Sequence, residues 1–190
     1  VTEYDEWLTI QRGGAPRKLT KAGAKYIYNA RMLGEYVHSD VLFQAYFNAA
    51  LIISSFGPEA LADENPYQDS RTQEGFISFG GPDIFGLLTK AANLALTGAW
   101  YQKWLVHRRL RPEAYSGRIY HQNAGAKDYE LPYEVSRSSI AGRIESQYGS
   151  YLLPMAFPEG SPMHPAYPSG HATIGGACVT ILKAFFAEDY

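Results

Sequence analysis

Apolar side chains recur at helical spacing near the end of the printed sequence. They stand at Ile174, Ala177, Cys178, Ile181, Leu182 and Phe185, which places them on one stripe of a helix. Ser169 occupies the N-cap position of this stretch, directly after Pro168, a residue that cannot continue a helix backwards. The pattern therefore predicts a helix that begins at Ser169 and buries one face.

A second helical pattern follows Pro82, which is a plausible entry residue. Its apolar positions are Ile84, Leu87, Leu88, Ala91, Leu94, Ala95 and Ala99. We expect one long helix that ends at Arg111, because the residue before a proline disfavours helical geometry. Lys103, His107 and Arg111 fall four apart, so they should lie along one drifting face of this helix.

The pattern in the rest of the chain also predicts helices and loops. One helix is expected at about 20–32 and another at about 39–54, whose broad apolar surface predicts burial on several sides. Residues 56–81 are rich in Pro, Gly, Asp and Asn and predict a loop. The polar stretch 115–149 contains one short helix near 135–148. No alternation is long enough to support a sheet, so the fold class is all-α.

The composition indicates a globular domain and argues against a nucleic-acid-binding or membrane-spanning protein. At 46% hydrophobic and 19% charged residues, the 190-residue chain has the make-up of a globular domain. Its net charge is −2, from 17 basic and 19 acidic residues, so it lacks the positive charge that is typical of nucleic-acid-binding proteins. No apolar stretch approaches the ~20 residues that span a bilayer. Cys178 is the single cysteine and lies in the apolar stripe, so we expect it to be buried.

Two clusters carry chemistry suited to a small anion. The first turn of the final helix offers the Ser169 hydroxyl, the Gly170 amide and the His171 imidazole, at the positive end of the helix dipole. Lys103 and Arg111 offer two cations on long side chains, which could converge on an anion between them. The plainer alternatives are a serine-capped helix with an incidental histidine, and a solvated basic helix end.

The combination Lys103-x7-Arg111-Pro112 followed by Pro168-Ser-Gly-His171 resembles the vanadium-dependent haloperoxidases of the algal bromoperoxidase type. That family shares its oxyanion pocket with type 2 phosphatidic acid phosphatases and bacterial acid phosphatases, whose signature usually has six residues between lysine and arginine rather than seven. Further stretches that look like the bromoperoxidases are 40–53, 75–82, 106–114, 152–165 and 176–186.

The resemblance implies a helical bundle of the acid phosphatase/vanadium-dependent haloperoxidase type. It also implies vanadate-dependent oxidation of bromide by hydrogen peroxide to hypobromous acid or an equivalent halogenating species. By this resemblance the vanadate-binding residues are Lys103, Arg111, Ser169, Gly170 and His171. His171 looks like the acid–base histidine, and Lys103 would also polarise the peroxide.

His164 and Gln102 enter as residues that tune the reaction. His164 resembles the additional active-site histidine of bromoperoxidases, and a structural histidine in a loop is the alternative. Prolines at 162, 165 and 168 predict a stiff, extended approach to the pocket. Gln102, uncharged and beside Lys103, is the second candidate for setting the halide preference.

One departure from the family pattern is large. The family pocket also needs a second arginine and a histidine that binds vanadium directly, both from a later helix, and residues 1–190 contain no such pair. We therefore expect either a single α-helical domain over 1–190 or a fragment of a longer haloperoxidase that lacks the vanadium-ligand helix. Such a fragment would be inactive alone, and its intact parent active.

The resemblance also suggests partners. These are hydrogen peroxide, bromide and an organic substrate, and the family forms homo-oligomers. Red-algal members carry a structural calcium in a comparable loop, and oxygen ligands here come from Asp63, Glu64, Gln68 and Asp69. A solvated acidic loop is the alternative to a calcium site.

Two other functions stay open at this point. A soluble acid phosphatase would use the same groups around phosphate, with the missing histidine as nucleophile. The seven-residue spacing and the stretches at 107–114 and 153–157 weigh against it. The third hypothesis is that the chain is a non-catalytic assembly module, since family members associate through helical surfaces.

Overall fold

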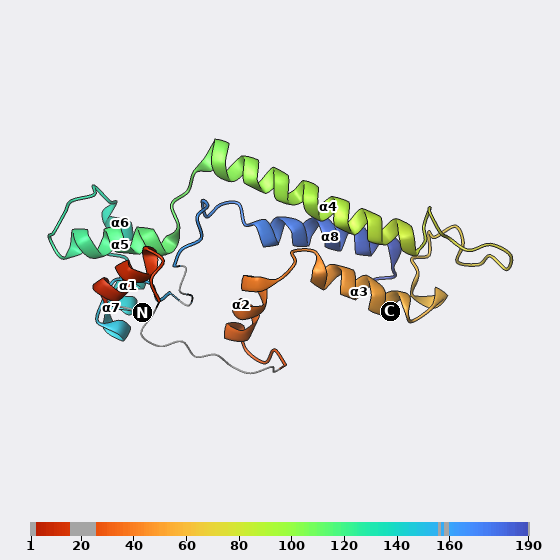
Figure 1. Cartoon of the computed structure of the whole chain (residues 1–190), viewed down its shortest axis with the longest axis horizontal. Helices are drawn as coiled ribbons and strands as arrows, with labels where there is room; N and C mark the ends of the chain where they lie inside the picture. The colour runs from red at the N-terminus through yellow and green to blue at the C-terminus, as the bar shows by residue number, and fades with distance from the viewer. Residues whose placement is uncertain (1–2, 16–25, 156, 158–159, 190) are drawn as a thin grey trace. The chain divides into compact units, whose positions relative to one another are not determined.

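The structure, a computed structural model, describes residues 3–15, 26–155, 157 and 160–189 (Figure 1). Every named element in these ranges is a helix, and the β-bridges among the described residues are isolated ones. The all-α prediction is confirmed. No described helix is both long enough and apolar enough to cross a membrane.

The chain divides into two compact units. Unit 1 consists of Val1–Ala24 and Lys103–Tyr167, and unit 2 consists of Lys25–Gln102 and Pro168–Tyr190. Each unit contains its own cluster of buried apolar side chains.

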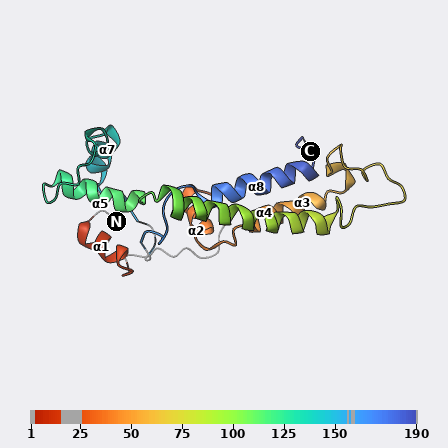
Figure 2. The same ribbon diagram turned by 90° about the horizontal axis from the view of Figure 1, so that it is seen from above.

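Unit 2 is built on two long helices. α4 (Gly81–Tyr101) and α8 (Gly170–Phe185) lie side by side, and α3 (Gln44–Ser54) packs against both (Figures 1 and 2). Each helix turns a stripe of apolar side chains inwards. The buried residues of this core are Ala50, Ile84, Leu88, Ala92, Ile174, Cys178, Phe185 and Phe186.

The start of α8 agrees with the sequence prediction. Ser169 is its N-cap, and the Ser169 hydroxyl accepts a hydrogen bond from the Ala172 amide at 3.3 Å. Cys178 is buried as expected, and burial raises the pKa of its thiol. The local signals of a capping serine and an apolar stripe were therefore sufficient to place this helix.

The predictions for residues 20–54 are wrong in their boundaries. α2 covers Ala30–Ser39, so residues 26–29 are not helical, and 20–25 lie outside the described residues. The helix begins where the Asn29 side chain accepts a hydrogen bond from the Met32 amide at 3.0 Å. A turn at 40–43 separates α2 from α3. Ile52 on α3 is 58% exposed, so burial of α3 on several sides is also wrong for the described residues.

The loop predicted over 56–81 is confirmed, apart from the short 3₁₀ helix η1 (Pro58–Ala60). Asn65 is buried in this loop and holds its fold. Its side chain accepts a hydrogen bond from the Tyr67 amide at 2.9 Å and donates one to the Phe79 carbonyl at 3.4 Å.

The long helix ends earlier than predicted. After α4, the chain continues as a six-residue π-helix, η2 (Gln102–His107), in which the Arg108 amide donates to the Lys103 carbonyl at 2.9 Å. Arg108 has φ of 47°, so the helix stops there rather than at Arg111. The prediction that Lys103, His107 and Arg111 lie along one helix face is therefore wrong, because a π turn holds more residues than an α turn.

Unit 1 contains several short helices. α1 (Tyr4–Gln11) places Trp7 and Ile10 against Leu152 and Met155. The other helices are α5 (Pro112–Asn123), α6 (Tyr133–Ser136) and α7 (Ser139–Tyr148). Only α7 corresponds to a predicted helix, the short one near 135–148. The polar stretch of α5 carries no apolar stripe that would have revealed it.

Packing between Trp7 and Gly117 gives a stability prediction for unit 1. A Cβ at position 117 would lie 2.5 Å from the Trp7 ring, so Gly117→Ala should destabilise the protein by about 1–3 kcal/mol through overpacking. Gly142→Ala on α7 is the matched control, because nothing lies within 4 Å of its Cβ. That change should stabilise the protein by about 0.5–1 kcal/mol. Denaturant unfolding measures both, and equal effects would contradict the packing argument.

Candidate functional site

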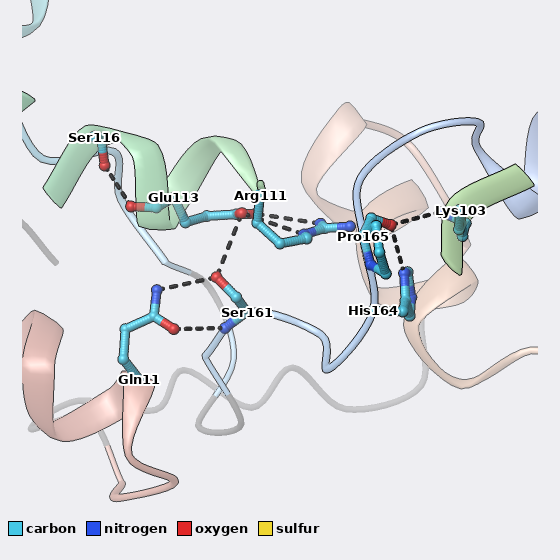
Figure 3. A network of polar contacts seen from close by, with 8 residues as sticks. All are labelled: Gln11, Lys103, Arg111, Glu113, Ser116, Ser161, His164 and Pro165. Atoms are coloured by element: carbon cyan, nitrogen blue, oxygen red, sulfur yellow. Dashed lines mark hydrogen bonds and ion pairs between the residues drawn. The ribbon is translucent and has the colours of Figure 1, made fainter. Parts of the chain in front are cut away.

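Lys103 is a buried cation in the π-helix η2. The residue is 2% exposed, and its Nζ donates a hydrogen bond to the Pro165 carbonyl at 2.8 Å (Figure 3). Burial, reinforced by the Arg111 guanidinium, lowers the pKa of the Lys103 ammonium. Single π turns occur frequently at functional sites, and this one turns a lysine inwards.

Lys103 has no carboxylate partner among the described residues. A buried charge is costly unless it is paired, and one carbonyl oxygen satisfies only one of the three ammonium donors. An anion held by the remaining donors would relieve that cost. The arrangement therefore favours an anion ligand over a purely structural lysine.

Arg111 is the N-cap residue of α5 and is held by Glu113. Its Nε and Nη2 atoms each lie 3.4 Å from a Glu113 carboxylate oxygen (Figure 3). The Ser161 hydroxyl donates to the same carboxylate at 3.4 Å. Glu113 thereby connects the arginine to the loop that contains His164. Sequence reasoning gave Glu113 no role.

The His164 loop is fixed by several hydrogen bonds within unit 1. Residues 160–168 are not helical, as the three prolines predicted. The Pro165 carbonyl oxygen lies 2.9 Å from His164 Nδ1 and also accepts a hydrogen bond from Lys103 Nζ (Figure 3). The Ala166 amide donates to the Arg109 carbonyl at 3.0 Å. These contacts tie the loop to the segment that carries the cations.

Arg111 and His164 line one cavity of unit 1. Its volume is about 550 Å³. Other lining residues include Trp104, Arg109, Met163 and Pro165. The structure thus brings two of the predicted site residues to one concave surface.

The remaining predicted residues lie in unit 2. Gly170 is the first residue of α8, and a Cβ added there would meet only the Leu96 side chain, at an ordinary 3.6 Å. Packing within unit 2 therefore does not require glycine at this position. Gln102 is the first residue of η2 and is half-buried. That the five residues predicted to bind vanadate do so around one cavity stays a prediction.

His171 is paired with a carboxylate that sequence reasoning missed. Its Nε2 lies 3.0 Å from Asp40 Oδ1, and the Asp40 side chain is 7% exposed against 46% for His171. Asp40 is the C-cap residue of α2, where the helix dipole disfavours negative charge. An aspartate at that unfavourable position was the available signal of a specific partner.

The calcium hypothesis has no support in the structure. No group of three or more His, Cys, Asp or Glu side chains within the described ranges could hold a metal ion. Asp63, Glu64 and Asp69 are exposed, and Gln68 is half-buried. The hydrogen bonds of Asn65 order this loop, so the geometry corresponds to the solvated acidic loop.

Residues 83–190, more than half of the chain, match the family model described as VCPO second helical-bundle domain. The chain belongs to the vanadium haloperoxidase family. The matched range contains the residues predicted to bind vanadate or to tune the halide, but not the predicted calcium loop at 63–69.

Vanadium-dependent bromoperoxidases are among its relatives. The one from Ascophyllum nodosum is 38% identical over 202 residues, which cover 100% of this chain and 36% of the relative. Those from Corallina officinalis and Corallina pilulifera are 39% and 41% identical, over 88% and 86% of this chain and 32% and 31% of the relatives. The chain therefore spans about a third of the length of these haloperoxidases.

The donors of both units are of the types that a haloperoxidase needs for vanadate. Vanadate is a tetrahedral oxyanion that resembles phosphate, and such anions are bound by lysine, by the planar guanidinium fork and by backbone amides at helix starts. Lys103 and Arg111 of unit 1 are cations of this kind, and the first turn of α8 in unit 2 has amides of this kind. The residues present fit the group that the family carries.

The lowered pKa of Lys103 predicts a pH dependence of stability in the vanadate-free protein. The unfolded chain binds this proton up to the ordinary value of 10.5, whereas the folded state loses it earlier. Between the two values the unfolded state holds more protons, so this residue makes the free energy of unfolding rise with pH. Lys103→Met should lack that increment.

Denaturant unfolding from neutral pH to 10.5 checks this prediction. Lys183→Met is the control, because Lys183 is exposed and paired with Glu188. Equal pH slopes in the unsubstituted protein and Lys103→Met would show that the two states of Lys103 do not differ.

Proposed function

We propose that this chain forms part of a vanadium-dependent bromoperoxidase, which oxidises bromide with hydrogen peroxide to hypobromous acid or an equivalent halogenating species. Its similarity to three bromoperoxidases over 86–100% of its length supports this. The observation that carries the proposal is the buried Lys103, which has no carboxylate partner among the described residues.

Each site residue has a proposed task toward vanadate. Lys103 and Arg111 neutralise its charge, and Arg111 adds a fork of parallel donors. The Ser169 hydroxyl and the Gly170 amide donate hydrogen bonds, and glycine at 170 lets the backbone approach closely. When bound, vanadate supplies the centre at which hydrogen peroxide is activated for the oxidation of bromide.

The overall reaction consumes a proton. Hydrogen peroxide, bromide and one proton give hypobromous acid and water, so an acid–base group must deliver that proton. We assign this to His171, whose Nε2 is engaged by Asp40 at 3.0 Å and whose Nδ1 is thereby left to exchange the proton. The Asp40 carboxylate holds the ring in place through this contact.

His164 and Gln102 are proposed to set the halide preference. His164 lines the cavity of unit 1 with Arg111. Gln102 is bonded directly to Lys103 in the chain and presents an uncharged side chain. An organic substrate as the acceptor of bromine, and assembly into a homo-oligomer, belong to the same proposal.

Substitutions should separate binding from proton transfer in the intact protein. His171→Ala should keep appreciable vanadate affinity but lower bromide oxidation by about 10²–10⁴-fold, because the proton-transfer group is lost. Asp40→Asn should lower the rate less, because the amide still contacts the ring but holds it less firmly. Arg111→Ala should weaken vanadate binding itself, by roughly 10–100-fold for one charged hydrogen-bonded contact. Vanadate titration and a bromide-oxidation assay measure the two effects.

Arg118→Ala is the matched control for Arg111. Arg118 is exposed on α5 over the Tyr129 ring and belongs to the same unit. It should leave vanadate affinity unchanged. Complete and equal loss of vanadate binding in His171→Ala and Arg111→Ala would contradict the division of roles.

Halide selectivity provides an independent test. Because bromide is easier to oxidise than chloride, we expect oxidation of bromide and iodide with weak or absent chloride turnover. Gln102→Ala should change the bromide-to-chloride ratio more than the vanadate affinity. Steady-state rates with each halide decide this, and chloride turnover equal to bromide turnover would contradict the bromoperoxidase assignment.

A further inference from the structure

Met163 is an exposed thioether on the wall of the unit 1 cavity. Its side chain is 94% exposed, although methionine is an apolar residue that usually fills core gaps. It lines the cavity together with Arg111 and His164. The other methionine of this unit, Met155, is 8% exposed and packs in the core with Trp7 and Leu152.

The backbone at Met163 is fixed by the neighbouring residues of the loop. Pro162 and Pro165 restrict the backbone on either side of the Met163–His164 pair. Pro165 is held by Lys103, and Ser161 contacts Glu113 and Gln11 (Figure 3). The backbone that carries the thioether is therefore held next to His164 in the sequence, and Met163 lines the same cavity as Arg111 and His164.

We propose that Met163 is an oxidation site, at which the thioether consumes the hypobromous acid made in the proposed bromide oxidation and becomes methionine sulfoxide. The proposal rests on the proposed function, which supplies the oxidant. Methionine oxidation is a common lesion whose site selectivity follows exposure, and sulfoxide reductases reverse it.

The step balances without a further reagent. The sulfur lone pair attacks bromine, the O–Br bond breaks and hydroxide leaves. Water then adds its oxygen to sulfur, the S–Br bond breaks and bromide departs, while the protons of that water pass to hydroxide and to solvent. Sulfur is oxidised and bromine is reduced, so thioether and hypobromous acid give sulfoxide, bromide and one proton. The halide returns to the reaction.

The cavity contains other groups that hypobromous acid attacks. Trp104, which is 44% exposed, and His164 line it as well. Sulfur is a softer and stronger nucleophile toward bromine than an indole or imidazole ring. Met163 therefore acts as a sacrificial acceptor when no organic substrate is present, and it spares the residues whose loss would damage the site.

The test measures oxidation of individual residues by mass spectrometry. The vanadate-loaded intact protein, of which this chain is a part, receives bromide and hydrogen peroxide, without organic substrate, and is digested after a few turnovers. Trypsin releases Met155 and Met163 on one peptide, 144–183, so each is the internal reference of the other. We expect sulfoxide at Met163 to form at least about tenfold faster than at Met155, as their exposures require. This oxidation should need vanadate, bromide and peroxide together.

A scavenger distinguishes local oxidant from oxidant free in solution. With excess free methionine present, turnover should still oxidise Met163, whereas hypobromous acid added from outside should be consumed first. Met163→Leu, which conserves side-chain volume, should then show earlier oxidation of Trp104 for the same amount of bromide oxidised. Met32→Leu on α2 of unit 2 is the matched control and should behave like the unsubstituted protein.

The outcomes separate this inference from the proposed function. Bromination of an added dye by the same sample shows whether bromide is oxidised at all. If the dye is brominated while Met163 is oxidised no faster than Met155, or as fast without bromide, the inference is overturned and the function stands. If the dye is not brominated, both fail. The peptide measurement on the unsubstituted protein decides the matter even where Met163→Leu does not fold.

Discussion

A buried ammonium group held by one carbonyl oxygen organises the candidate site. Lys103 is out of contact with water, its pKa is lowered, and its Nζ donates to the Pro165 carbonyl. This bond joins the cation-bearing segment after α4 to the proline-rich loop before α8. The energetic cost of desolvating an ammonium without a counter-charge is accepted in the folded state, which is typical of sites prepared for an anionic ligand.

Other polar contacts of unit 1 hold Arg111 and the loop that contains His164. Glu113 holds Arg111 and is contacted by Ser161, so the start of α5 and the loop at 160–165 constrain each other. In unit 2, Asp40 constrains His171 in a comparable way. Precise placement of charged groups depends on such partners, because a long side chain without them samples many rotamers.

The sequence suggested candidate site residues but not the contacts that position them. The helix from Ser169 was predictable because a capping serine and an apolar stripe are local signals. The end of α4 was not, because the apolar spacing used to predict the helix gives no sign of the change from α to π turns at Gln102. α5 lacks an apolar stripe, and the Asp40–His171 pair joins residues 131 positions apart. Neither follows from local pattern.

The π-helix η2 contains four of the seven residues between Lys103 and Arg111. A π turn closes its hydrogen bonds from residue i to i+5 and so accommodates one more residue than an α turn. Because each π turn contains this additional residue, the side chains that follow Lys103 face other directions than they would on a continued α-helix.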